Sequence, residues 1–162
     1  KTDDEFAIGS LNKANTQINK MTNMINGFLN VSRLESSQIH IDSQPFDFAD
    51  LIREAEEEAL SIVTTHRILF KPVQPTPVFA DYDKITQVIN NLISNAVKYS
   101  PAGSQIEVSC VTVNGMAQLS VRDQGMGISE KDLDKLFDRY YRVEGDQMKS
   151  ISGFGIGLYL CS

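Results

Sequence analysis

The sequence lacks any cluster of lysine and arginine and carries a formal net charge of −6, which argues against a nucleic-acid partner. It has no apolar run of the roughly 18 residues that a membrane span requires, and no signal peptide. Cysteine is scarce as well. Cys110 and Cys161 are far apart and have no metal-ligand spacing, so we expect free thiols in a reducing compartment.

What remains is ordinary for a globular protein. The chain has 162 residues, of which 41% are hydrophobic and 22% are charged. This length fits one domain of common size with an additional segment. Because the first residue is Lys rather than Met, we expect the sequence to be a piece of a longer chain.

The N-terminal residues carry a heptad pattern. Leu11, Ile18 and Ile25 are seven residues apart, and Ala14, Met21 and Phe28 each follow three residues later. This is the a/d pattern of a helix that packs against a partner helix. The helix is either a dimerisation element or packed on its own domain. We favour dimerisation, because a helix of about 30 residues would extend past a small core.

The next segment alternates strands and helices. We predict a strand at residues 39–42 that stops near Pro45, and then a helix capped by Asp47. The apolar side of this helix is Leu51, Ile52, Ala55, Ala59, Ile62 and Val63. Strands at 67–70 and 78–80 follow, joined by a proline-rich connection, and Asp81 or Asp83 begins the following helix.

That following helix carries an unusual polar stripe. Asn91, Asn95 and Lys98 lie at i, i+4 and i+7, beside an apolar face with spacings of three and four. Asparagine is a poor residue for a helix interior. Its amide oxygen suits a hard cation, and a lysine suits a phosphate. The alternative is a solvated polar face.

A β-hairpin follows. Asn114-Gly115 is the strongest short hairpin signal, and a two-residue turn pairs Val113 with Met116. In this register one face must be the core face, namely Ile106, Val108, Cys110, Thr112, Ala117, Leu119 and Val121. The same parity predicts that Asp123 points to the core side, where a carboxylate needs a donor.

Two glycine motifs follow the hairpin. Residues 123–128 read D-Q-G-M-G-I, and residues 153–158 read G-F-G-I-G-L at the start of a predicted helix. Between them, Ser129 is expected to cap a short helix with Leu133, Leu136 and Phe137, and an aromatic and basic segment spans 139–142. The second glycine motif misses the dinucleotide fingerprint, because no strand precedes it and its third spacing differs, and the sequence has no phosphate loop of GKS or GKT type.

The ordered set of motifs resembles the catalytic ATP-binding domain of sensor histidine kinases, whose N, G1, F and G2 boxes occur in this order. The helix ending at residues 30–35 resembles the second helix of that family's dimerisation and phosphotransfer hairpin. The resemblance implies an α+β fold, a two-layer α/β sandwich of the histidine kinase and gyrase type, preceded by one long helix. Residues 1–37 would be the partial dimerisation helix. Residues 38–162 would be the catalytic domain, without its last helix and strands.

The resemblance also implies roles for single residues. Asn91 and Asn95 would hold Mg²⁺ and triphosphate oxygens, and Lys98 would contact a phosphate. Asp123 would accept a hydrogen bond from the adenine amino group. Arg142 would approach the terminal phosphate, or is equally a surface cation. Further nucleotide contacts would come from Tyr99, Gly125, Gly127, Ile128, Gly153, Gly155, Gly157 and Leu158. Residues 144–152 would form an ATP lid.

The implied activity is transfer of the γ-phosphoryl group of Mg-ATP to a histidine and then to a response-regulator aspartate. The implied protein is a homodimer through the N-terminal helix, in the cytoplasmic domain of a membrane-bound sensor. The family's acceptor histidine precedes an acidic residue, which is true of neither His40 nor His66. We therefore expect both to be strand-edge histidines, and this chain alone to bind nucleotide without transferring phosphate.

Three alternatives stay open. Gyrase and heat-shock-chaperone relatives share these motifs but hydrolyse ATP with a glutamate ahead of the first asparagine. Here Gln87 lies one turn before Asn91, and no glutamate lies between residues 82 and 100. A serine-directed anti-sigma kinase would not be expected to carry the heptad helix. In a purely structural dimer domain, Asn91, Asn95 and Asp123 would be only hydrogen-bonded core residues.

Overall fold

The computed structural model describes residues 40–143 and 153–162 and, in the N-terminal part, residues 7–11, 13–15, 17–18, 21–22, 24–25 and 29. The chain divides into two compact units, Lys1–Ile39 and His40–Ser162. Every described residue of the first unit is helical, as the heptad pattern predicts, and Leu11, Ile18 and Ile25 are exposed. Phe28 and the predicted end of this helix at 30–35 lie outside the described residues.

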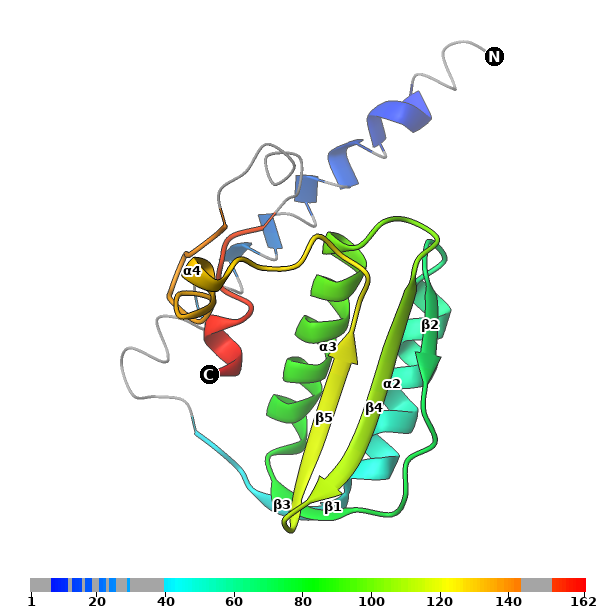
Figure 1. Cartoon of the computed structure of the whole chain (residues 1–162). Coiled ribbons are helices and arrows are strands. Elements are labelled where there is room, and N and C mark those ends of the chain that lie inside the picture. The colour runs from blue at the N-terminus through cyan, green and yellow to red at the C-terminus, as the bar shows by residue number, and fades with distance from the viewer. Residues whose placement is uncertain are drawn as a thin grey trace. The chain divides into compact units, whose positions relative to one another are not determined.

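The second unit is built in two layers (Figure 1). Its three-stranded sheet has the order β2-β4-β5, formed by Arg67–Phe70, Gln105–Val113 and Met116–Arg122. Strand β2 is parallel to β4, and β5 is antiparallel to β4. Helices α2 (Phe48–Ile62) and α3 (Tyr82–Tyr99) cover one face of this sheet. A separate antiparallel pair consists of β1 (Gln44–Asp47) and β3 (Pro77–Ala80). The predicted two-layer α/β arrangement is therefore confirmed.

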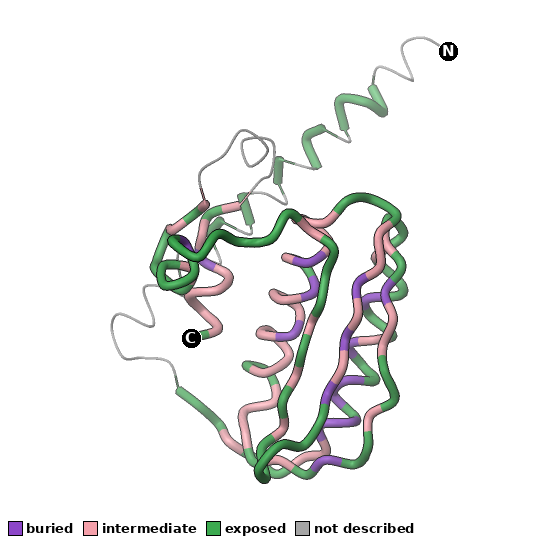
Figure 2. Tube along the Cα trace, viewed as in Figure 1, coloured by how far each residue is buried: buried purple, intermediate pink, exposed green. Residues whose placement is uncertain are grey.

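The core lies between the sheet and the two helices. Figure 2 shows the buried residues along α2, α3 and β4. Ile89, Ile93 and Ala96 form the buried face of α3, with Ile89 completely inaccessible to solvent. The hairpin register is the predicted one: Val113 pairs with Met116 and Val108 with Val121. The predicted core face is buried as far as Cys110 along β4, but Thr112 is exposed near the hairpin tip.

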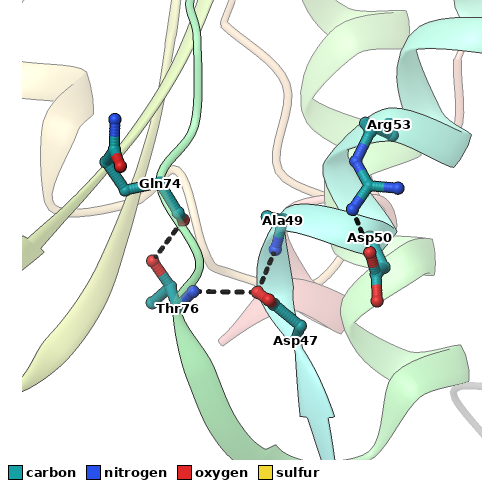
Figure 3. Close-up of polar contacts among 6 residues, drawn as sticks. All are labelled: Asp47, Ala49, Asp50, Arg53, Gln74 and Thr76. Atoms are coloured by element: carbon teal, nitrogen blue, oxygen red, sulfur yellow. Dashed lines mark hydrogen bonds and ion pairs between the residues drawn. The ribbon is translucent and has the colours of Figure 1, made fainter.

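Helix α2 begins with an aspartate cap that also links the end of β1 to the residue before β3 (Figure 3). Asp47 Oδ1 accepts hydrogen bonds from the backbone N–H groups of Ala49 at 2.9 Å and Thr76 at 2.8 Å. The cap is therefore as predicted. The strand before it is not at 39–42 but at Gln44–Asp47, and Pro45 lies inside it. Proline is tolerated there because β1 has a partner on one side only.

Three further elements differ from the sequence prediction. Ile62 ends α2 with 69% of its surface exposed, so the buried face of that helix stops one turn earlier. Helix α4 is short, Glu130–Leu133, and Phe137 lies outside it and is exposed. Residues 135–138 instead form turns with hydrogen bonds to the third residue before. The last glycine motif opens not an α-helix but a 3₁₀ helix, η2 (Tyr159–Cys161).

None of the described helices is both long and apolar enough to cross a membrane.

Candidate functional site

The two glycine loops, far apart in the sequence, both approach the C-terminal half of α3. Asp81 caps the start of this helix, and Ser100 follows its end, directly before Pro101. The loop after β5 passes the end of α3, where Gly125 packs against the carbonyl group of Tyr99. The loop at residues 153–158 lies along the polar stripe of the helix, where Gly157 approaches Asn91. One helix end thus brings the predicted motifs together.

Asn91 is tied to the second glycine loop. Its Nδ2 group donates to the Gly157 carbonyl oxygen at 3.5 Å and lies 3.8 Å from Cys161 Sγ. The Cys161 thiol in turn donates to the same carbonyl oxygen at 3.2 Å. Sequence reasoning treated Cys161 only as a free thiol, although its position four residues after Gly157 was the available signal. Burial raises the pKa of Cys161, so the thiol stays protonated at neutral pH.

Lys98 and Asn95 continue the stripe, and both are half-buried. Burial is the larger cause that lowers the pKa of Lys98, and the positive charge of Arg142 lowers it further. The Lys98 ammonium also lies against Gly153 and 5.1 Å from the ring centroid of Tyr99. Within the described part of the chain, the Asn95 side chain makes no hydrogen bond. Lys98 of the stripe thus has a second cation, Arg142, near it, and the Asn95 amide has no hydrogen-bond partner among the described residues.

Asp123 does not lie as predicted. Its side chain is exposed rather than turned into the core, and Oδ1 accepts a hydrogen bond of 2.6 Å from the Gly125 N–H. The donor that this carboxylate needed therefore comes from its own loop, which curls back immediately after β5. A Cβ on Gly125 would lie 2.6 Å from Asp123 Oδ1 and 2.7 Å from the Tyr99 carbonyl oxygen. Gly127 and Ile128 follow on the exposed side of this loop.

Gly155 is the most constrained residue of the second loop. Its φ of +66° lies in the left-handed region, and its carbonyl oxygen accepts a hydrogen bond of 2.9 Å from the Tyr140 N–H. A Cβ here would lie 2.6 Å from the Tyr141 carbonyl oxygen. Leu158 closes the loop, half-buried, directly before η2. The aromatic segment around residue 140 therefore supports the glycine loop, a contact that no spacing in the sequence indicates.

His66 lies directly before β2, as expected, but His40 lies outside any strand because β1 begins only at Gln44. His40 is exposed, and the His66 ring contacts Thr65 Oγ1 at 2.9 Å and the Ser100 carbonyl oxygen at 3.3 Å. Residues 40–143 and 153–162, with the described part of the first unit, contain no group of three or more His, Cys, Asp or Glu that could hold a metal ion.

Residues 80–162, slightly more than half of the chain, match the family described as histidine kinase-, DNA gyrase B- and HSP90-like ATPases. The chain belongs to this family. The matched range begins at the last residue of β3 and includes α3 and both glycine loops. The resemblance that the sequence motifs suggested is thereby confirmed.

Within this ATPase family, the similar proteins are sensor kinases. The chain is 36% identical to the adaptive-response sensory kinase SasA of Synechococcus sp. (strain JA-3-3Ab), over 91% of this chain and 40% of SasA. It is 35% identical to the sensor histidine kinase WalK of Bacillus subtilis, over 86% of this chain and 23% of WalK. The chain thus spans less than half the length of these relatives.

A solved structure agrees with this assignment. The Acinetobacter baumannii histidine kinase AdeS is similar with a TM-score of 0.67 and 26% identity, over 90% of this chain and 66% of that one. The two-layer α/β arrangement of the second unit is therefore the fold of histidine kinase catalytic domains.

Proposed function

We propose that this chain is the ATP-binding catalytic core of a sensor histidine kinase. The observation that carries the proposal is the pair of cations at the end of α3. Lys98 is half-buried beside the second glycine loop, and the charge of Arg142 is close enough to lower its pKa. A polyphosphate would neutralise both charges, and the half-buried ammonium of Lys98 would be stabilised by such an anion.

The nucleotide would lie along α3, with its base toward the first glycine loop and its phosphates toward the second. Asp123 would accept a hydrogen bond from the adenine amino group, and Tyr99 would lie against the nucleotide. Lys98 and Arg142 would contact phosphate oxygens, and the backbone N–H groups of the second loop would surround them. The remaining contacts would come from Gly125, Gly127, Ile128, Gly153, Gly155, Gly157 and Leu158.

The residues present fit a magnesium ion that accompanies the nucleotide. Mg²⁺ is commonly held by one or two protein groups, substrate phosphates and water rather than by a complete protein cage. Asn91 and Asn95 would supply amide oxygens. The Nδ2 group of Asn91 donates to Gly157, so its amide oxygen is the atom that would serve a cation. When bound, the ion offsets the charge of the phosphates.

In the whole protein, the γ-phosphoryl group would pass to a histidine nitrogen and then to an aspartate of a response-regulator receiver domain. An unperturbed histidine has a pKa of about 6.5 and is largely neutral at pH 7, so it needs little activation. The task of this domain is therefore to place the phosphate and to stabilise its charge, with Lys98 and Arg142 near the transferred group.

The proposed domain organisation is the one that the family resemblance implies. Residues 1–37 would be one helix of the dimerisation and phosphotransfer hairpin and would form a homodimer through the heptad positions. Residues 38–162 would be the catalytic domain, on the cytoplasmic side of a membrane-bound sensor. The exposed Leu11, Ile18 and Ile25 are consistent with a helix that binds a partner helix.

Calorimetric titration with ATP, with and without Mg²⁺, tests this function. Asn95→Ala should weaken Mg-ATP binding by about tenfold or more, the value of a charge-assisted contact. Asn90→Ala is the matched control, because Asn90 is on the same helix but donates to Glu58 of α2 at 3.1 Å. Equal binding heats for Asn95→Ala and the unchanged chain would reject the assignment of that residue. No heat from the unchanged chain would reject ATP binding by these residues.

A further inference from the structure

A buried carboxylate outside the proposed nucleotide contacts supports the second glycine loop. Asp132 is 8% exposed, and both of its carboxylate oxygens accept hydrogen bonds. The Tyr141 hydroxyl donates to Oδ1 at 2.7 Å, and the Ser129 hydroxyl donates to Oδ2 at 2.6 Å. These two hydrogen bonds, that of Ser129 first, hold the pKa of Asp132 below its ordinary value. The group is therefore ionised at neutral pH.

The tyrosine that Asp132 holds is next to the glycine loop. The Tyr140 N–H donates to the Gly155 carbonyl oxygen at 2.9 Å. On the other side, the Tyr141 carbonyl oxygen lies 2.6 Å from the position that a Cβ on Gly155 would occupy. The backbone at 140–141 therefore touches Gly155 through one hydrogen bond and one close packing contact. A shift of this backbone would move the loop with it.

Asp132 reaches the glycine loop only indirectly, through Tyr141, and is therefore not itself a nucleotide contact. Its two oxygens are occupied by hydroxyl donors, and its connection to the loop runs through the ring of Tyr141. Sequence reasoning assigned Ser129 as a helix cap, but the cap makes no side-chain hydrogen bond to the helix backbone. The Ser-x-x-Asp spacing of a capping box is present, but Ser129 donates to the Asp132 carboxylate, which accepts the hydrogen bond of Tyr141.

We propose that Asp132 is a positioning residue for nucleotide binding, which fixes Tyr141 and thereby sets the position of the Gly155 loop. This inference rests on the proposed function, because it assigns the loop to the phosphates. It predicts a selective effect. Loss of the Asp132–Tyr141 hydrogen bond should weaken the binding of the triphosphate part. It should spare the base, since the loop that carries Asp123 is held separately at the end of α3.

The test compares Tyr141→Phe and Asp132→Asn with the control Asp134→Asn. Asp134 is also in the 130–138 region but is exposed, so the control makes the same change of charge and leaves the tyrosine contact intact. Binding of Mg-ATP and of adenosine is measured by NMR titration of the 162-residue chain. Hydrogen exchange of the Tyr140 amide and the midpoint of thermal unfolding are measured on the same samples.

We expect Tyr141→Phe and Asp132→Asn to lower the affinity for Mg-ATP by about fivefold, the effect of one hydrogen bond. Adenosine affinity should change by less than about twofold, and exchange of the Tyr140 amide should become faster. The control should match the unchanged chain. Equal losses of ATP and adenosine affinity, or no loss at all, would overturn the inference while Asn95→Ala still shows reduced binding. If Asn95→Ala also binds as the unchanged chain does, the proposed function fails instead.

Discussion

Gly155→Ala is the substitution that most directly probes the second glycine loop. The structure predicts two separate penalties. Alanine in the left-handed region, at a φ of +66°, costs about 1–2 kcal/mol. In addition, the new Cβ would lie 2.6 Å from the Tyr141 carbonyl oxygen and 2.7 Å from the Tyr140 carbonyl carbon. Ordinary contacts begin at 3.4 Å, so about 0.8 Å of movement (3.4 − 2.6) is required of the backbone.

Gly103→Ala separates these penalties. Gly103 has a φ of +83°, and nothing lies within 4 Å of the Cβ position, so only the conformational penalty applies there. For a chain of this size, that penalty corresponds to a fall of about 2–8 °C in the unfolding midpoint. The unfolding midpoint of Gly155→Ala should fall at least as far. Its Mg-ATP affinity should also fall about tenfold, because the displaced N–H groups of the loop no longer reach the phosphates. Gly103→Ala should bind Mg-ATP as the unchanged chain does.

The two penalties are tested by thermal unfolding and calorimetric titration of the unchanged chain, Gly155→Ala and Gly103→Ala. The reasoning is refuted if Gly155→Ala retains both the Mg-ATP affinity and the unfolding midpoint of Gly103→Ala. In that case the loop would accommodate a methyl group without moving, and the contacts at 140–141 would not constrain it. A loss of stability without a loss of affinity would show instead that the loop is structural and does not contact the phosphates.

Two further predictions concern charge. Since burial and Arg142 lower the pKa of Lys98, the folded protein carries an unfavourable charge below that pKa. The penalty falls as the pH rises above the folded pKa and is gone above the unfolded pKa. Lys98→Met should therefore raise the unfolding midpoint at pH 7 without nucleotide, and raise it less in strong alkali. It should also weaken Mg-ATP binding by about tenfold or more, and an unchanged affinity would contradict this. The N–H groups of Thr76 and Ala49 lower the pKa of Asp47, so this carboxylate stabilises the fold above its unfolded pKa and loses that effect as the pH falls through its folded pKa. Asp47→Ala should lower the midpoint at pH 7 and differ less from the unchanged chain at pH 2, and an equal difference at both pH values would argue against the cap.

Local sequence patterns predicted most elements of the second unit. The Asn-Gly turn gave the register of β4 and β5 because a two-residue turn leaves one possible pairing. The apolar spacing in 82–99 predicted α3 with Ile89 and Ala96 on its buried side, but not Ile93. Asp47 was the predicted cap of α2, and Asp81 was one of two predicted caps of α3. The errors lie where tertiary contacts act on weak local signals. Pro45 is inside β1 because that strand has a single partner, and Phe137 is outside α4 because the chain turns after Leu133.

For the candidate site, the sequence by itself determined the order of the motifs and predicted which residues would carry the chemistry. Amide, ammonium and glycine at fixed spacings suffice for that, because side-chain chemistry and helix periodicity are local properties. Only the tertiary structure decided that Asp123 is satisfied by its own loop and that Cys161 contacts Asn91. It alone showed that Asp132 reaches the glycine loop through Tyr141. Each of these depends on how separate segments pack together, and residue spacing along the chain does not specify such packing.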